Sequence, residues 1–337
     1  MYPPQMLGLP EAVDALAEES GFAGVVSVDR GGQIEFARAY GFAHRAFEIP
    51  NAVDTRFGIA SGTKGLTALA VVSLIEQDAL RLSTTARSVL GRDLPLIGDD
   101  VTIEHLLAHR SGIGDYLDEE AGYEIADYMM TAPVHELATT EQYLAVLDGY
   151  PAKFPAGDRF SYCNSGYVVL ALIAERVSGV PFHDLVRHRV CAPAGMLGTE
   201  FFRSDGLPDR TAVGYLSIAG VSRTNVFHLP VRGSGDGGIY STAADMSLFW
   251  RSLFAGTIVS GDWVAEMVRP RSDVPSASRH DTSTNSSASE PSLAVSSAGI
   301  EYDPVPVPRH RDIDRHDLMR EAHGDPWRSS GSLYECF

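Results

Sequence analysis

The stretch Asp54-Thr-Arg-Phe-Gly-Ile-Ala-Ser61-Gly-Thr-Lys64 places a serine three positions before a lysine and leads directly into a long apolar segment. Only two lysines occur in the chain, Lys64 and Lys153, so the other 25 of its 27 basic residues are arginines. Arginine serves most surface charge roles and keeps its proton, whereas the pKa of a lysine falls on burial or beside positive charge. A lysine retained here therefore indicates a titratable amine that activates Ser61 as a nucleophile. The alternative is a surface helix start with a solvated lysine.

The segment from Ser61 to about Asp78 is predicted to be helical. Its apolar positions follow i, i+3, i+4, i+7 spacing at Leu66, Leu69, Ala70 and Ser73/Leu74. Residues three apart share one face of a helix, so Ser61 and Lys64 are expected to point into the same cleft. Free N–H groups at the helix N-terminus also favour negative charge that develops near the nucleophile.

A second group of polar residues, Tyr162-Cys163-Asn164, precedes another predicted helix, from Gly166 to Ser178. A phenol acts as a base only where a nearby cation lowers its pKa, and Lys64 is the candidate cation. Asn164 or Ser165 is expected to cap the helix, while Gly179 and Pro181 mark its end. The alternative is that Tyr162 is a core aromatic residue and Asn164 only a helix cap.

The rest of the chain predicts a mixed α/β architecture in two lobes. Residues 22–47 read as a β-hairpin with a turn at Asp29-Arg30-Gly31-Gly32, residues 80–200 as a mostly helical lobe, and Thr242-Ala-Ala-Asp245 as the capping box of a further helix. Residues 1–275 are expected to form the catalytic domain. The tail, residues 276–337, is expected to be poorly ordered, because it holds few apolar residues to offset chain entropy.

Composition excludes several classes of partner. The 337-residue chain carries a formal net charge of −17, which argues against nucleic acid and against an anionic membrane surface. Its first residues have neither the basic nor the apolar region of a secretory signal, and no stretch is long and apolar enough to span a membrane. Three cysteines are too few for a disulfide framework. A cytoplasmic protein is expected.

The chain resembles the serine β-lactamase and penicillin-binding-protein-like family, especially its class C β-lactamase and esterase branch. The resemblance covers about residues 10–270 in family order and rests on four segments: Asp54–Lys64, Ile103-Glu-His-Leu-Leu-Ala-His109-Arg-Ser111-Gly112, Phe154-Pro155-Ala-Gly157 with Tyr162–Tyr167, and Gly237–Asp245. The Ser-x-x-Lys pattern is a known signature of this superfamily. The resemblance implies a β-lactamase-like two-lobed fold, with an antiparallel sheet flanked by helices and a helical lobe at about residues 80–200.

The resemblance also implies roles for individual residues. Ser61 would be the acylated nucleophile, and its backbone N–H would be one oxyanion donor. Lys64 would prepare either Tyr162 or Ser61 for proton transfer. Whether Lys64 or Tyr162 is the general base is left open. Tyr162 would relay a proton to the leaving group and then activate the deacylating water. Asn164 would contact the carbonyl or amide of the substrate.

The sequence departs from the family pattern near its end. A third motif, Lys-Thr-Gly or His-x-Gly, is expected 50–70 residues after the Gly237-Gly238 segment, but no lysine follows Lys153 and no histidine in the tail is followed two residues later by glycine. The alternating apolar pattern of the family's last strands is missing as well. We hypothesise that residues from about 275 onward derive from a shifted reading frame or a divergent gene end, which the coding DNA read in its other frames would test.

No cofactor is expected. His105 and His109 have a spacing that can bind metal, yet no third ligand lies at a recognisable distance, so a metal site is not predicted. The sequence therefore predicts a serine hydrolase that acts through an acyl-enzyme on a small ester, lactam or peptide substrate. The rival prediction is a catalytically silent relative that serves as a binding or regulatory module. The physiological substrate and the oligomeric state are left open.

Overall fold

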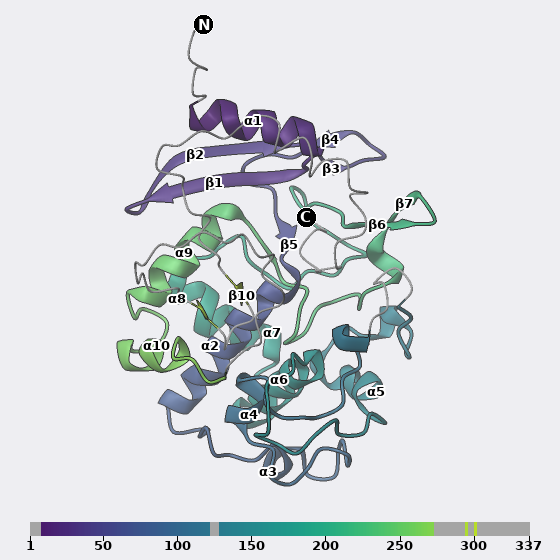
Figure 1. Cartoon of the computed structure of the whole chain (residues 1–337), viewed down its shortest axis with the longest axis vertical. Helices are drawn as coiled ribbons and strands as arrows, with labels where there is room; N and C mark the ends of the chain where they lie inside the picture. Colours follow the sequence, from purple (N-terminus) through teal and green to yellow (C-terminus); the bar gives the residue numbers. More distant parts are fainter. Residues whose placement is uncertain (1–7, 122–127, 273–293, 296–299, 302–337) are drawn as a thin grey trace, which may run out of the picture.

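The computed structural model of the chain describes residues 8–121, 128–272, 294–295 and 300–301. Helix α2 (Thr63–Glu76) and helix α6 (Asn164–Ser178) pack against each other through the middle of the molecule. In Figure 1 a layer made of strands β1 (Gly24–Arg30) and β2 (Gln33–Tyr40) and helix α1 (Leu9–Ser20) lies above these two helices, and a group of short helices lies below them. The segment that holds Ser61 and Lys64 leads into α2 at the junction of the two parts.

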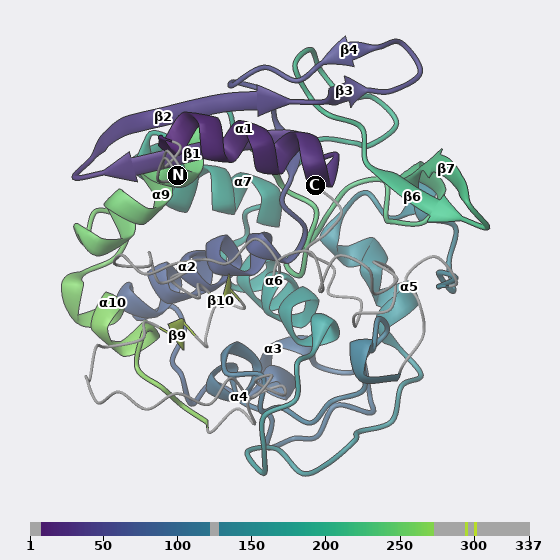
Figure 2. The ribbon, with the colours of Figure 1, turned by 45° about the horizontal axis from the view of Figure 1, so that its top comes forward.

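The upper layer is built on the predicted hairpin, which is confirmed. Strand β1 (Gly24–Arg30) pairs antiparallel with β2 (Gln33–Tyr40), with one register shift between Val28 and Asp29. Helix α1 (Leu9–Ser20) lies over one face of the hairpin and α9 (Ala243–Phe254) over the other (Figure 2). The Tyr40 hydroxyl donates to the Asp14 carboxylate at 2.8 Å, which ties α1 to the hairpin.

The remaining strands of the described residues also form two-stranded antiparallel pairs rather than one continuous sheet. They are β3 (Phe42–His44) with β4 (Ile49–Pro50), β5 (Phe57–Gly58) with β8 (Tyr240–Ser241), β6 (Tyr215–Ile218) with β7 (Val221–Thr224), and β9 (Ala294–Val295) with β10 (Ile300–Glu301). The pairing of β5 with β8 joins segments more than 180 residues apart. It brings the chain that leads to Ser61 beside the glycine-rich segment before β8.

The other helices are short and cluster around α2 and α6. They are α3 (Ala86–Leu90), α4 (Ile103–Leu107), α5 (Leu144–Leu147), α7 (Phe182–Val186), α8 (Ala192–Ala194) and α10 (Gly261–Met267). The expected helical lobe at about 80–200 corresponds to α3 through α8.

Helix α2 was expected to bury one apolar stripe, but it is buried on every side. All thirteen residues from Thr63 to Ile75 are buried, including Lys64 and Thr67. Neighbours on several sides explain this, because α6, α7 and the π-helical turn Arg187–Cys191 all contact α2. Lys64 therefore lies in the protein interior, contrary to the surface-helix alternative.

The start of α6 differs from the prediction in its cap. Asn164 is the first helical residue, and neither its side chain nor that of Ser165 caps the helix. The carboxylate of Asp115, from a distant loop, accepts hydrogen bonds from the backbone N–H groups of both residues at 2.8 Å. This cap frees the Asn164 side chain for another role. The predicted end of the helix is confirmed, since Gly179 adopts the left-handed conformation with φ +68°.

The predicted cap of α9 is also present. The Thr242 hydroxyl accepts from the backbone N–H of Asp245 at 3.1 Å. The Asp245 carboxylate, however, turns to Gly198 N–H and the Thr199 hydroxyl, at 2.8 and 2.7 Å. It joins α9 to the segment after α8 instead of completing the box.

The glycine-rich segment 233–238 packs tightly against α6. A Cβ added at Gly235 would lie 2.1 Å from the backbone oxygen of Tyr167, so only glycine fits there. The segment therefore reaches into the centre of the molecule, between α2 and α6.

The predicted tail lies almost entirely outside the described residues. Only the β9–β10 pair belongs to it, so the prediction of poor order and the reading-frame hypothesis are not tested here. Among the described residues, no single helix is long and apolar enough to cross a bilayer. Helix α6 and the run Phe182–Ala194 reach that length and composition only as a pair bent by 84°.

Candidate active site

Ser61 lies in a 3₁₀ turn, Ala60–Gly62, between β5 and α2. The residue before it, Ala60, has φ +41°, a left-handed conformation that is costly for a non-glycine residue. The Thr63 hydroxyl holds this turn by donating to the backbone oxygen of Ala60 at 2.7 Å and accepting from the N–H of Ile239 at 3.2 Å. The turn presents the half-buried Ser61 side chain to a cavity.

Lys64 is fully buried, and its amine makes three hydrogen bonds. Nζ donates to Ser61 Oγ at 3.0 Å, to Asn164 Oδ1 at 2.8 Å and to the backbone oxygen of Asp236 at 2.6 Å. Asn164 is 100 residues and Asp236 172 residues from Lys64 in sequence. The structure thus brings Ser61, Lys64 and Asn164 together. The sequence predicted this proximity for Ser61 and Lys64.

Burial lowers the pKa of Lys64 to about 8, because the charged amine has lost its contact with water. Three carboxylates, of Asp236, Glu119 and Asp115 in order of effect, oppose this change by attracting the ammonium. A lysine with a pKa near neutrality exchanges its proton readily at physiological pH.

Asn164 is held at both ends of its amide. Its oxygen accepts from Lys64, and its nitrogen donates to the backbone oxygen of Leu117 at 2.8 Å and to Glu119 at 3.4 Å. These partners fix the direction of the amide, so that its oxygen faces the amine. Asn164 also lines the cavity beside Ser61.

Tyr162 meets Lys64 with the face of its ring. Nζ lies 4.8 Å from the ring centroid, a distance typical of a cation–π contact. The ring of the half-buried Tyr162 also stacks on the ring of His109, with their centroids 4.6 Å apart. The phenol is thus next to the amine, but Tyr162 is not among the residues that line the cavity.

His109 is the residue whose place the sequence did not predict. Its buried ring stacks between Tyr162 and Tyr167, and its Nδ1 accepts from the backbone N–H of Cys163 at 3.1 Å. Burial, together with the nearby Lys64, lowers the pKa of His109 to about 3, so the ring is neutral. His109 therefore holds the Tyr162–Asn164 segment in place. His105 forms a capping box with Thr102. The described residues contain no group of three His, Cys, Asp or Glu side chains that could hold a metal ion.

Asp236 is a second residue that sequence reasoning missed. Its carboxylate is buried and accepts a short hydrogen bond from the Tyr116 hydroxyl. Burial raises the pKa of Asp236, while Lys64 and the Tyr116 hydrogen bond act in the opposite direction. The signal that could have found it is its position inside the glycine-rich segment 233–238, because glycine allows a close approach of the backbone.

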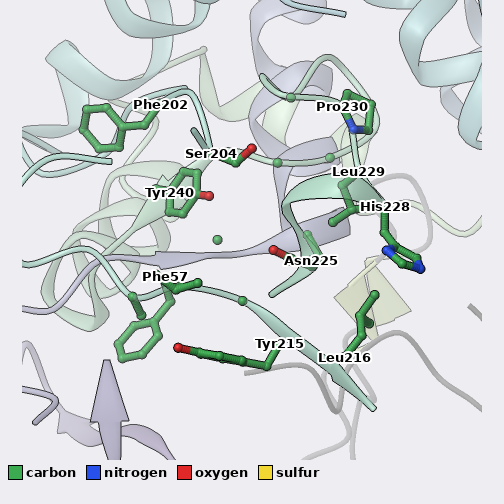
Figure 3. A pocket seen from close by; sticks show the side chains of 18 of the residues that line it. Phe57, Phe202, Ser204, Tyr215, Leu216, Asn225, His228, Leu229, Pro230 and Tyr240 are labelled. Carbon is green, nitrogen blue, oxygen red and sulfur yellow. The ribbon is translucent and has the colours of Figure 1, made fainter. Parts of the chain in front are cut away.

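Ser61 opens onto a cavity of about 260 Å³. Figure 3 shows the part of this cavity formed by β5, β6, β8 and the segment 225–230, where aromatic rings and a few polar side chains face the same space. Asn164, Asp236 and Gly237 line the cavity near the nucleophile. A serine hydroxyl bonded to a buried amine at the edge of an apolar cavity has the chemistry of an acyl-transfer site.

Comparison with known proteins shows the family of the chain. The family model described as Beta-lactamase matches residues 9–292. The chain is 28% identical over 261 residues to a penicillin-binding protein of Bacillus subtilis (73% of this chain, 55% of the relative), and 34% identical over 207 residues to esterase EstB of Burkholderia gladioli (60% and 52%). The chain therefore spans a little over half the length of these relatives.

A solved structure, of a penicillin-binding protein from Bacillus halodurans, superimposes with a TM-score of 0.74 at 37% identity, covering 78% of this chain and 80% of that one. The β-lactamase-like fold expected from the sequence is therefore confirmed. The chain belongs to the Beta-lactamase family.

Proposed function

We propose that the protein is a serine hydrolase that cleaves an ester, amide or β-lactam through an acyl-enzyme on Ser61. The observation that carries this proposal is the hydrogen bond between Lys64 Nζ and Ser61 Oγ at 3.0 Å, made by an amine whose pKa burial lowers to about 8. The family includes proteins named as an esterase and as penicillin-binding proteins, which agrees with this class of reaction.

The hydrogen bonds of Lys64 favour this residue as the general base for Ser61. Two of its three acceptors, Asn164 Oδ1 and the backbone oxygen of Asp236, are carbonyl oxygens that only accept. A neutral amine keeps both bonds with its two N–H groups. Its lone pair then points to the third partner, the Ser61 hydroxyl, and is placed to take the proton.

The reaction then proceeds in two steps. Ser61 Oγ attacks the carbonyl carbon while its proton passes to Lys64, and the bond to the leaving group breaks as that group takes up a proton. Water hydrolyses the acyl-enzyme and restores the Ser61 hydroxyl. Tyr162 as proton relay and the Ser61 N–H as oxyanion donor remain predictions, as does a contact between Asn164 and the substrate.

Covalent labelling tests the proposal. A fluorescent fluorophosphonate is expected to label the protein, and Ser61→Ala is expected to abolish the label. Ser88→Ala, which changes an exposed serine in α3, is the matched control and is expected to label normally. Absence of label on the unchanged protein would favour the catalytically silent relative.

Turnover then distinguishes the substrates. Hydrolysis of p-nitrophenyl acetate and nitrocefin, measured in parallel, compares esterase with β-lactamase activity. We expect the ester to be the better substrate, because p-nitrophenyl acetate is smaller than nitrocefin and the cavity of about 260 Å³ lies just below the roughly 300–1,000 Å³ typical of small-molecule pockets. A cytoplasmic location, inferred from the sequence, stays a prediction.

A further inference from the structure

One part of the cavity wall is built largely from aromatic rings. Phe57 comes from β5, Phe202 from the segment after α8, Tyr215 from β6 and Tyr240 from β8, and all four are half-buried. In Figure 3, Phe57 and Tyr215 lie on one side of the space and Phe202 and Tyr240 on the other. The Phe202 and Tyr240 centroids are 5.9 Å apart, so these two rings support each other. Four separate segments thus converge to present rings to one space.

Among the described residues that line the cavity, Arg45 and Asp236 carry a guanidinium or carboxyl group, and each contacts other side chains of the protein. The Arg45 guanidinium lies over the Tyr215 ring at 4.7 Å and donates to Ser222 Oγ at 2.9 Å. The Asp236 carboxylate is buried against the Tyr116 hydroxyl and beside Lys64. Burial raises the pKa of Tyr240 to about 12, so this phenol is uncharged. A substrate anion would have to draw the Arg45 guanidinium away from the Tyr215 ring and Ser222, and a substrate cation would meet only the carboxylate of Asp236, which is already bonded within the protein.

Two buried side-chain oxygens of the cavity wall have no hydrogen-bond partner among the described residues. They are the buried Oγ of Ser204 and Oδ1 of Asn51, whose Nδ2 already donates to the backbone oxygen of Tyr40 at 2.7 Å. Ser204 is two residues after Phe202 in sequence and lies near Phe202 and Tyr240 in Figure 3. A buried polar atom without a partner is costly, so a ligand that supplies one is favoured.

We propose that the rings of Phe57, Phe202, Tyr215 and Tyr240 form an aromatic subsite that selects esters or amides carrying an uncharged aromatic group, with Ser204 hydrogen-bonding a polar substituent of that group. The inference rests on the proposed function, since it names the substrate class of the same site. Aromatic groups bury a large area and gain further from ring–ring contacts, whereas a charged group would lose its hydration and meet only charges already bonded within the protein.

A series of acetate esters tests the subsite, with each kcat/KM divided by the rate of hydroxide hydrolysis of the same ester. Benzyl acetate is compared with cyclohexylmethyl acetate, which has a similar size but no aromatic ring. We expect benzyl acetate to be about three- to tenfold better. The 4-carboxybenzyl and 4-(aminomethyl)benzyl acetates are both expected to be worse than benzyl acetate by about tenfold or more.

The variants locate the effect. Phe202→Leu and Phe57→Leu keep apolar volume but remove a ring, and each is expected to abolish most of the preference for benzyl over cyclohexylmethyl acetate. Phe227→Leu is the matched control, because Phe227 is 83% exposed and does not line the cavity. Ser204→Ala is expected to reduce kcat/KM for 3-hydroxybenzyl acetate by a larger factor than for benzyl acetate.

The failure of this inference and the failure of the proposed function give different results. If fluorophosphonate labels Ser61 but benzyl and cyclohexylmethyl acetates react equally well, or a charged ester reacts best, the aromatic subsite is wrong and the hydrolase stands. If no label forms, the proposed function is wrong. In that case, saturation-transfer NMR of benzyl alcohol with the protein tests the subsite by itself. Binding that is lost in Phe202→Leu and kept in Phe227→Leu supports the aromatic subsite. Equal signals in both variants overturn it.

Discussion

The backbone oxygen of Asp236 accepts a hydrogen bond of 2.6 Å from Lys64 Nζ, while the carboxylate of the same residue lies buried against Tyr116. One residue therefore both orients the amine and supplies the strongest attraction to its positive charge. The glycine-rich segment makes this possible, since Gly235 lets the backbone pass against α6. A segment far away in sequence thus raises the proton affinity of Lys64, against the larger effect of burial.

Replacing Asp236 with Asn is expected to make Lys64 easier to deprotonate. The change keeps the backbone oxygen and the shape of the side chain but removes the negative charge that raises the pKa of Lys64. The acid limb of kcat/KM is therefore expected to move to lower pH by about one pH unit. A pH profile with p-nitrophenyl acetate measures it. Asp205→Asn, at an exposed pair with Arg203, is the control, and an identical profile for both variants would contradict the role of Asp236.

The unchanged protein is expected to gain activity as the pH rises through about 8. The pKa of Lys64 is lowered to about 8, so below that pH the amine is mostly charged and holds no lone pair for Ser61. Above it, the base form predominates. The measurement is kcat/KM from pH 5 to 10, and a profile that is flat between pH 6 and 9 would argue that Lys64 is not the base.

The two lysines of the chain provide a matched pair. Lys64→Arg keeps the charge but introduces a group that does not deprotonate, into a site with no solvent exposure, and Lys64→Ala removes the base. Each is expected to lower kcat/KM by about 10³-fold or more. Lys153→Arg, at an ion pair with Asp118 of 2.8 Å, is expected to be near normal. Near-normal turnover in Lys64→Ala would refute the mechanism.

His109→Phe tests the clamp on the Tyr162–Asn164 segment. Phenylalanine preserves the stacking between Tyr162 and Tyr167 but leaves the N–H of Cys163 without its acceptor, which costs about 1–3 kcal/mol. Urea denaturation is expected to show this loss, with a reduced kcat. The acid limb of the pH profile is expected to stay in place, because His109 is already neutral. His135→Phe, at an exposed position, is the control, and a moved acid limb would assign His109 a role in proton transfer.

Asp115→Ala is expected to destabilise the protein by loosening the start of α6. The carboxylate accepts from the N–H groups of Asn164 and Ser165 at 2.8 Å each, and losing a helix cap costs about 0.5–2 kcal/mol. Asp115→Asn retains one oxygen acceptor and is expected to lose less. Denaturation midpoints of the two variants measure the difference, and equal stability of Asp115→Ala and the unchanged protein would show that the cap is dispensable.

Local features of the chain were predictable from sequence because neighbouring residues decide them. The hairpin β1–β2 follows from alternating strand residues around a glycine turn, and the end of α6 from Gly179, whose left-handed backbone favours glycine. The approach of Ser61 to Lys64 follows from their spacing at the start of a helix. The burial of α2 on all sides was not predictable, because its neighbours come from distant segments.

The sequence by itself determined that a serine and a titratable lysine lie three positions apart at the start of a helix, and which family of folds would hold them. Only the tertiary structure decided what surrounds the amine: the Asp236 oxygen, the direction of the Asn164 amide, the Asp115 cap and the neutral His109 stack. These contacts join segments separated by tens to more than a hundred residues. Their geometry depends on how β5 pairs with β8 and how α2 packs on α6, which no short-range pattern specifies.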